Sequence, residues 1–353
     1  MKKSTSLLLL FIICLYACRK DNTSPEPQVY GLLVPGNFPM PEVMKDNMLS
    51  EQGVALGRML FYDKRLSGNN QLSCASCHKQ ALAFSDGLAL SNRGASGKTL
   101  PRTAPALINL AWSNNGLFWD GGSTNLESQA FGPITNEDEM HQNLDELVYE
   151  LNQVPEYVKR FKLVFHDDIK TGYVARALAQ FQRTLISGNS RYDHYMRNEA
   201  GGTLNDTELS GLRLFNTHCR SCHAGELFTD DNYHNNGLDS GFSNDALEGL
   251  FQGRFRITYD PSDLGKFKTP TLRNIALTAP YMHDGRLKDL PAVLAHYSHG
   301  IKVSATTDRT LMHNGQPGLL LTKDEQNAII AFLHTLTDNS FVQNRDLSEP
   351  AIP

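Results

Sequence analysis

The sequence predicts a mainly α-helical protein built from two tandem domains with extensive loops. Its 353 residues are enough for two domains of roughly 150 residues each. Apolar residues recur at helical spacing in several segments, whereas the alternation typical of β-strands is confined to short pieces. A third observation is that one short motif, C-x-x-C-H, occurs twice, at 74–78 and at 219–223. The two copies are far enough apart to lie one in each domain.

The repeated motif is the signature of covalent haem attachment. Two thiols three positions apart can bond the two vinyl groups of one haem, and the adjacent imidazole becomes a ligand of its iron. A redox dithiol or half a zinc site is the alternative, but a redox dithiol does not need the His in fifth place, and a zinc site would have its Cys pairs close together. The sequence therefore predicts two covalently bound haem c groups. Their expected ligands are Cys74, Cys77 and His78 for haem 1, and Cys219, Cys222 and His223 for haem 2.

Helical periodicity and capping signals place five helices. The first follows Ser50, a favoured N-cap residue, and the last follows a capping box of Thr322 and Glu325. Three more are expected between them, with apolar faces at 144–151, 155–165 and 174–185, the second of which has Pro155 at its first position.

A weak internal repeat accompanies the two motifs. The stretches Gly57–Phe61 and Gly211–Phe215 precede the first and second motif, and Phe84 and Phe228 follow them. This order of helix, haem loop and aromatic residue suggests two cytochrome c-like units, although chance similarity between short apolar helices is the alternative. Residues 87–105 are expected to form a long loop, and residues 198–205 the linker. We therefore place the domains at 36–197 and 198–345.

The N-terminus has the pattern of a targeting segment. Lys2 and Lys3 precede a short apolar run, Leu7–Leu15, which is too short to span a bilayer. The run ends in Leu-Tyr-Ala-Cys, which resembles a bacterial lipobox and would make Cys18 a lipid-bearing first residue. A plain signal peptide is the alternative. We expect a signal peptide at 1–18, a flexible tether at 19–35, and a periplasmic location in the bacterial cell envelope, lipid-anchored or soluble.

Composition limits the partners. The net charge of −5 gives no basic face for nucleic acid, and is compatible with a basic electron-transfer partner. Of the six cysteines, Cys14 lies in the targeting segment and Cys18 would carry lipid. The other four are assigned to haem, so no disulfide is expected.

From about Glu51 to Leu336 the chain resembles bacterial di-haem cytochrome c peroxidases of the broader family that includes MauG. Besides the haem motifs, two stretches carry the resemblance. One is Phe-Trp-Asp-Gly-Gly at 118–122, followed by Glu127, Gln129, Pro133 and Glu139. The other is Thr-Pro-Thr-Leu-Arg-Asn at 269–274, continuing through Ala-Pro-Tyr-Met-His-Asp-Gly at 279–285.

The resemblance implies that peroxide reacts at haem 1, beside Gln129, Pro133 and Glu139. Cleaving the O–O bond needs a group that takes a proton and returns it to the leaving oxygen, and we assign Glu139 to this step. The alternative is that Glu139 belongs to a solvated acidic turn at 136–139. Many relatives carry a His that blocks this haem, but the corresponding stretch, 92–95, has none. Haem 1 is therefore expected to be open without prior reduction.

Haem 2 is the electron-transfer site in the family. The position of its usual distal Met falls here on Tyr297, as in MauG-like proteins, and a phenolate ligand would lower the potential. The alternatives are a core aromatic role for Tyr297, or ligation by one of three other residues, Met282, His299 or Met312.

Two further roles follow from the resemblance. Trp119 matches a Trp between the haems that assists electron transfer, with a large core residue as the alternative. Thr278 and Pro280 match two carbonyl ligands of an interdomain calcium ion, but the usual Asn is missing at 102–105. His283 is expected near haem propionates.

The sequence thus predicts a peroxidase that reduces hydrogen peroxide with electrons from a small carrier such as cytochrome c. A MauG-like enzyme that oxidises residues of a partner protein is the first alternative, and a non-catalytic di-haem electron carrier is the second. A homodimer is possible, as in many peroxidases of the family.

Overall fold

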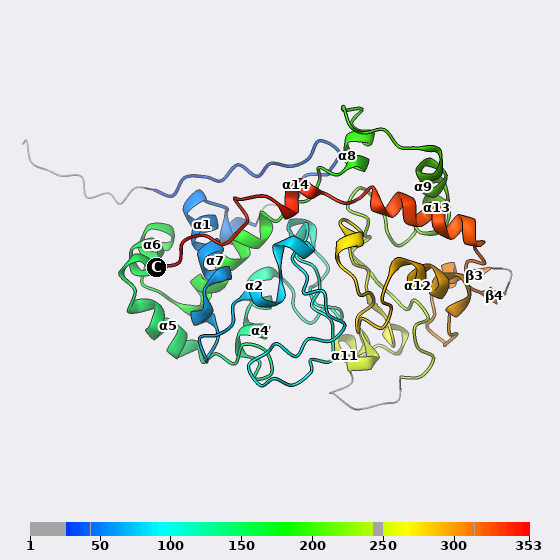
Figure 1. The fold of residues 1–353 in the computed structure, drawn as a ribbon. Coiled ribbons are helices and arrows are strands. Elements are labelled where there is room, and N and C mark those ends of the chain that lie inside the picture. Colours follow the sequence, from blue (N-terminus) through cyan, green and yellow to red (C-terminus); the bar gives the residue numbers. More distant parts are fainter. Residues whose placement is uncertain (1–25, 43, 243–249, 314) are drawn as a thin grey trace, which may run out of the picture.

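The computed structural model describes residues 26–42, 44–242, 250–313 and 315–353. The predicted signal peptide, with Cys14 and Cys18, lies outside these residues. Within them the chain forms two helical lobes, which stand side by side in Figure 1. No helix in the described ranges is both long and apolar enough to cross a membrane.

The first lobe is built around the packed pair α1 and α7. Its helices are α1 (Glu51–Tyr62), α2 (Cys74–Cys77), α3 (Leu126–Gln129), α4 (Phe131–Thr135), α5 (Leu144–Asn152), α6 (Pro155–Phe165) and α7 (Thr171–Arg183). The four predicted helices of this half are all present. The side chain of Ser50 accepts a hydrogen bond from the amide of Gly53, and Pro155 is the first residue of α6.

The second lobe is built around the corresponding pair α9 and α13. Its helices are α8 (Arg191–Met196), α9 (Asp206–His218), α11 (Phe255–Thr258), α12 (Leu290–Ala295) with the π-helical turn η9 (His296–Gly300) and α13 (Lys323–His334). The last helix, α14 (Asn339–Val342), packs against the first lobe. The predicted capping box of Thr322 and Glu325 starts α13.

Strands and single turns complete the structure. Strand β1 (Tyr233–His234) pairs antiparallel with β2 (Phe267–Lys268), and β3 (Met312–His313) with β4 (Gln316–Pro317). The 3-10 turns are η2 (Lys45–Asn47), η3 (Lys64–Leu66), η4 (Gln80–Leu82), η5 (Leu110–Trp112), η6 (Leu250–Gln252), η7 (Pro261–Asp263), η8 (Ile275–Leu277) and η10 (Arg309–Leu311). Residues 87–105 contain no helix or strand, as expected for a loop.

Each lobe has its own hydrophobic core, but the chain crosses between them. Tyr192 of α8 packs in the second core, and the C-terminal residues Phe341 and Leu347 pack in the first. In Figure 1 the C-terminal segment returns from α13 across the molecule to end near α6, and residues 26–42 run along the top toward α8. The lobes are therefore interlocked by both terminal segments.

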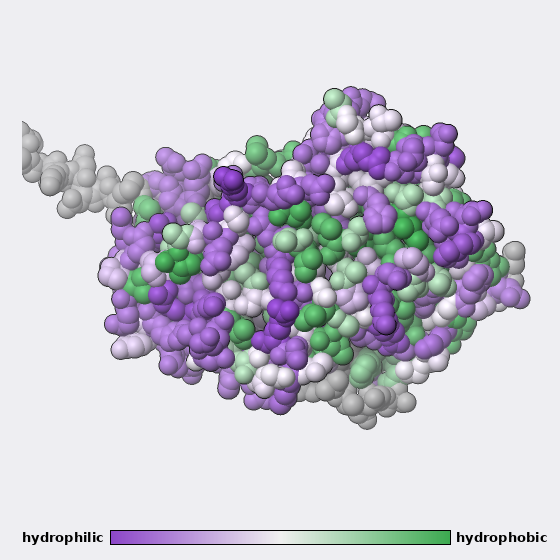
Figure 2. Space-filling view, in the orientation of Figure 1, coloured by the Kyte–Doolittle hydropathy of each residue, from purple (hydrophilic) through white to green (hydrophobic). Residues whose placement is uncertain are grey.

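On the face drawn in Figure 2, hydrophilic residues predominate over the end that carries α5 and α6.

The internal repeat extends to the helix crossings. A Cβ added to Gly57 would lie 1.9 Å from the carbonyl oxygen of Ala177, and one added to Gly211 would lie 1.9 Å from that of Ala328. The aromatic residues repeat as well: Phe61 contacts both Phe84 and Phe181 in the first lobe, and Phe215 contacts both Phe228 and Phe332 in the second. In each lobe a glycine thus brings two helix backbones together behind the haem loop.

Replacing the glycine at one crossing should destabilise the protein. We expect Gly57→Ala to lower the free energy of unfolding by about 1–3 kcal/mol, because the new methyl group overlaps backbone atoms. Gly172→Ala in α7 is the control, since no atom lies within 4 Å of its added Cβ, and helix propensity alone favours it by roughly 0.5–1 kcal/mol. Thermal unfolding of both variants tests this prediction. Equal melting temperatures for Gly57→Ala and Gly172→Ala would contradict the close approach of α1 to α7.

Candidate active site

The first C-x-x-C-H motif forms helix α2 and ends at its C-cap residue, His78. The imidazole Nδ1 of His78 lies 2.9 Å from the carbonyl oxygen of Phe84. Because a carbonyl can only accept, Nδ1 carries the proton and Nε2 is left to bind iron. Burial lowers the pKa of His78, which favours the neutral ring that a metal ligand requires.

The second motif repeats this geometry. Nδ1 of His223 lies 3.1 Å from the carbonyl oxygen of Phe228, and burial lowers the pKa of His223 to about 4. Phe84 and Phe228 both have positive φ, at 58° and 54°, which turns their carbonyls toward the rings. All four motif cysteines are free thiols, and burial raises the pKa of Cys74 and Cys219 to about 12. Both loops therefore present two thiols and one neutral imidazole, the set that binds haem c.

A cavity of about 420 Å³ lies beside the second motif and extends to residues of the first lobe, but Cys74, Cys77, His78, Pro133 and Glu139 are not among its lining residues. Residues of the second motif line it together with Tyr297, Trp119 and Gln129. The buried Nε2 of His283, which also lines the cavity, has no hydrogen-bond partner among the described residues. His283 is held flat against Phe267, with ring centroids 3.7 Å apart. An unsatisfied buried nitrogen facing a cavity suits a bound polar group such as a haem propionate.

The predicted distal residues of haem 1 come from α3, α4 and the turn after α4. Gln129 ends α3 and lines the cavity. Glu127, on the same short helix, forms a bidentate ion pair with Arg183 of α7, at 2.7 and 3.0 Å. Glu127 therefore fixes the position of α3, and thereby of Gln129. The carbonyl of Pro133 accepts a hydrogen bond from the amide of Met140, at 3.1 Å, which ties α4 to the turn.

Glu139 is half-buried rather than fully solvated. Burial raises the pKa of its carboxyl group, and a hydrogen bond from Asn136 at 2.8 Å lowers it in part. The charge of Glu139 contributes to the raised pKa of the Cys77 thiol, so the carboxyl group lies near the first haem motif.

The loop that carries a blocking His in many relatives is fastened to Glu139. The amide of Ala95 donates to the carbonyl of Glu139, at 2.6 Å. A Cβ added to Gly94 would lie 1.7 Å from the carbonyl oxygen of Asp138, and Lys98 pairs with the Asp138 carboxylate at 3.0 Å. The loop therefore packs closely against the turn that presents Glu139.

Tyr297 lies in the π-helical turn η9 and lines the cavity beside the second motif. Such turns are frequent at functional sites. Burial raises the pKa of its phenol to about 12, although a hydrogen bond with Asn236 acts in the opposite direction. Among the alternative ligands, Met282 also lines the cavity, and its sulfur accepts from Asn236 at 3.1 Å. His299 is exposed.

Trp119 joins the lobes at the cavity wall. Its indole Nε1 donates to the carbonyl of Thr103, at 3.0 Å, and its own carbonyl accepts from the amide of Lys268, at 2.8 Å. Thr278 and Pro280 line the same cavity. Two carbonyls are few for calcium, which takes six to eight oxygens, so calcium binding at these residues stays a prediction.

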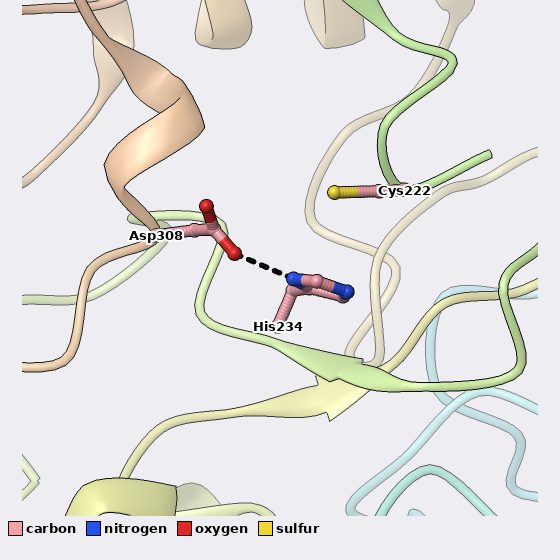
Figure 3. A group of neighbouring side chains, drawn as sticks. All are labelled: Cys222, His234 and Asp308. Carbon is pink, nitrogen blue, oxygen red and sulfur yellow. Dashed lines mark hydrogen bonds and ion pairs between the residues drawn. The ribbon is translucent and has the colours of Figure 1, made fainter. Parts of the chain in front are cut away.

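A charged cluster next to haem 2 could be mistaken for a metal site. Ligand atoms of Cys222, His234 and Asp308 all lie within 4.8 Å of one another, and Figure 3 shows the three side chains converging, with the imidazole hydrogen-bonded to Asp308. Both nitrogens of His234 are already engaged, by Asp308 at 2.5 Å and by Asp230 at 2.8 Å. The hydrogen bond with Asp308 is the largest cause that raises the pKa of His234. Because Cys222 is assigned to haem, we interpret the cluster as a structural ion-pair group rather than a metal site. His234 joins Asp230, in the haem 2 loop, to Asp308, and we call these three residues the charged clamp.

Sequence reasoning did not identify this clamp or the buried pair of Arg273 and Asp193, whose side chains are 0% exposed. Their partners lie far apart in the chain. A local signal existed only for Arg273, which belongs to the Thr-Pro-Thr-Leu-Arg-Asn stretch.

Known proteins resemble this chain over most of its length. Residues 51–201 match the family described as di-haem cytochrome c peroxidase. The methylamine utilization protein MauG of Methylorubrum extorquens is 38% identical over 86% of this chain and 82% of its own. The cytochrome c551 peroxidase of Nitrosomonas europaea is 32% identical over 99% and 94%.

Solved structures agree with this similarity. The crystal structure of a MauG-like protein associated with microbial copper homeostasis has 35% identity and a TM-score of 0.82, over 91% of this chain and 99% of that one. The diheme peroxidase BthA of Burkholderia thailandensis, at 22% identity and a TM-score of 0.71, shares the fold. These matches confirm the mainly helical class with tandem cytochrome c-like domains and the two haem c groups. The chain belongs to the di-haem cytochrome c peroxidase family that includes MauG.

Proposed function

We propose that this enzyme reduces hydrogen peroxide to water with two electrons from a small reduced carrier such as cytochrome c. The observation that carries the proposal is the setting of Glu139. A half-buried carboxyl group with a raised pKa lies near the first haem motif, and the chain has no His between His78 and His141 that could block that haem.

Gln129, Glu139 and Trp119 each have a different role in this reaction. The haem supplies the electron-transfer chemistry, and the balance is one peroxide, two electrons and two protons to two waters. Gln129 can hold peroxide by hydrogen bonding from the cavity wall. Glu139 would take a proton from one oxygen of peroxide and return it to the other, which a carboxyl group of raised pKa does well near neutral pH. Trp119, in contact with both lobes, assists electron transfer between them.

A MauG-like reaction, in which residues of a partner protein are oxidised, is the second candidate. Tyr297 beside the second motif favours it, because a phenolate ligand stabilises oxidised iron. A non-catalytic electron carrier is the third, and it leaves Glu139 without a role.

We also propose the setting of the enzyme. Domains at 36–197 and 198–345 carry one haem each, and a lipid at Cys18 anchors the chain in the bacterial cell envelope on the periplasmic side. The partners are a small electron-donor protein and, for the second candidate, a protein substrate. A homodimer is compatible with this arrangement.

The proposal is tested on fully haem-loaded ferric protein without reductant. We expect peroxide to change the haem spectrum at once, and reduced cytochrome c to be oxidised steadily afterwards, because no His blocks haem 1. A long-lived oxidised spectrum with negligible cytochrome c oxidation would favour the MauG-like candidate. No spectral change on adding peroxide would contradict an open haem 1.

Removing the carboxyl group should slow the peroxide reaction. We expect Glu139→Gln to lower its rate constant by about 10²-fold or more, the usual contribution of a positioned acid–base group. In the unmodified protein the rate should fall as pH drops through the raised pKa of Glu139, because only the carboxylate accepts a proton. Stopped-flow spectroscopy measures both effects.

Glu137→Gln is the matched control, since Glu137 is exposed in the same acidic turn. Equal rate constants for the two variants would remove Glu139 from the mechanism.

The assignment of Tyr297 as the distal ligand of haem 2 is tested separately. We expect Tyr297→Met to raise the midpoint potential of haem 2, because a thioether stabilises reduced iron more than a phenolate does. Spectroelectrochemistry and electron paramagnetic resonance follow the change, and His299→Ala, at an exposed neighbour, is the control. An unchanged haem 2 resonance in Tyr297→Phe would show that another group binds the iron.

A further inference from the structure

Arg273 is completely enclosed, and its guanidinium group makes an unusually full set of contacts. It pairs with Asp193 through two hydrogen bonds, at 2.8 and 2.9 Å. Its Nε donates to the carbonyl of Glu226, at 2.8 Å, and one terminal nitrogen donates to the same carbonyl. A buried charge is tolerated when it is paired and hydrogen-bonded in this way. Arg273 therefore anchors the main chain at Glu226.

That main chain is the loop that orients the proximal ligand of haem 2. Phe228, two residues after Glu226, provides the carbonyl that holds Nδ1 of His223. The guanidinium also lies over the ring of Phe228, at 5.5 Å. Beside it, the hydroxyl of Thr271 donates to the carbonyl of Leu227, at 2.6 Å. The whole stretch 226–228 is thus fixed by residues 271–273.

The guanidinium group is also in contact with the N-terminal segment. The ring of Phe38 lies 4.4 Å from the guanidinium carbon of Arg273, and the side-chain amide of Asn37 donates to Asp193, at 2.9 Å. Phe38 also packs edge-on against Trp112, whose indole nitrogen donates to the carbonyl of Pro39, at 2.9 Å. We call residues 35–39 the N-terminal strap.

The first lobe has no charge at the corresponding position. The stretch Pro105–Asn109 repeats Pro270–Asn274: the carbonyls of Pro105 and Pro270 face the two proximal His rings, and Asn109 and Asn274 both have positive φ. Ile108 then corresponds to Arg273.

The haem 1 loop is instead covered by the other end of the chain. The ring of Phe341 lies 5.5 Å from that of Phe84, and the side chain of Gln80 donates to the carbonyl of Asn344, at 2.7 Å. Each terminal segment thus covers the haem loop of the opposite lobe.

We propose that Arg273 is a positioning residue for haem 2, and that the N-terminal strap completes its enclosure, so that the docking of the strap sets the orientation of His223. The strap follows the stretch that leads to Cys18. A membrane-proximal segment is in this way linked to the electron-transfer haem. The proposal rests on His223 as the proximal ligand of haem 2, and it holds for either candidate reaction.

The test uses the full-length protein with both haems. We expect Phe38→Ala to raise the midpoint potential of haem 2 and to alter its electron paramagnetic resonance signal, while haem 1 stays unchanged. The reason is that a looser Phe228 carbonyl makes His223 a weaker donor to ferric iron. Met40→Ala is the matched control, because Met40 lies at the end of the same segment and is 79% exposed.

Two further variants separate positioning from stability. Arg273→Lys keeps the charge but loses the forked pairing, so it should shift haem 2 in the same direction. Phe341→Ala should shift haem 1 alone. Lower melting temperatures with both potentials unchanged would overturn the proposal, as would equal shifts of both haems in Phe38→Ala. Pyridine haemochrome spectra establish that each variant holds two haems, and because potentials are measured without peroxide, failure of the proposed reaction would not affect the result.

Discussion

The structure depends on one hydrogen bond that occurs twice, from Nδ1 of a proximal histidine to the carbonyl of a phenylalanine. An imidazole can present Nε2 to iron in a fixed direction only if its other nitrogen is held. Holding it requires Phe84 and Phe228 to adopt positive φ, which costs free energy in a residue with a side chain. Both rings are fully buried among other aromatic residues, and this packing offsets the strain.

The two haem loops are held in one frame. The side-chain amide of Asn109 donates to the carbonyl of Ser187, and that of Asn274 donates to the hydroxyl of the same serine. Two stretches more than 150 positions apart therefore meet at a single residue between α7 and α8. Ser187 therefore ties the two stretches to one point of the backbone.

Features that depend on nearby residues could be predicted from the sequence. The haem motifs, the caps at Ser50 and Thr322 and the start of α6 at Pro155 are set by spacing and local chemistry. The helix crossings could not be predicted, because Gly57 meets Ala177 only after the lobe has folded.

The same limit applies to the candidate site. Gln129 and Glu127 could be named from their motif, but the pairing of Glu127 with Arg183 could not, because it forms only when α3 packs on α7. Arg273 stood in a recognised stretch, yet its function depends on Asp193, eighty residues earlier. Ion pairs between distant segments leave no periodic signal. The flexible tether at 19–35 is inferred from composition alone. Within that range, Val29 forms an isolated β-bridge with Ser50 at the start of α1, a contact between distant residues that composition does not indicate.

Because the two lobes repeat the same helix and loop arrangement, the two haems can differ in reactivity and potential only through residues that the repeat does not share. The proposed distal sides differ most, because Gln129 and Glu139 in the first lobe and Tyr297 in the second come from segments that the repeat does not share. The proximal sides differ by two exchanges, Ala106 for Thr271 and Ile108 for Arg273, and by which terminus covers each loop. An apolar side chain leaves the first loop to be held by packing, whereas a paired guanidinium ties the second to α8 and to the N-terminal strap. Since the exchange of Ile108 for Arg273 acts on the carbonyl that orients His223, it can tune haem 2 without disturbing the frame that both haems share.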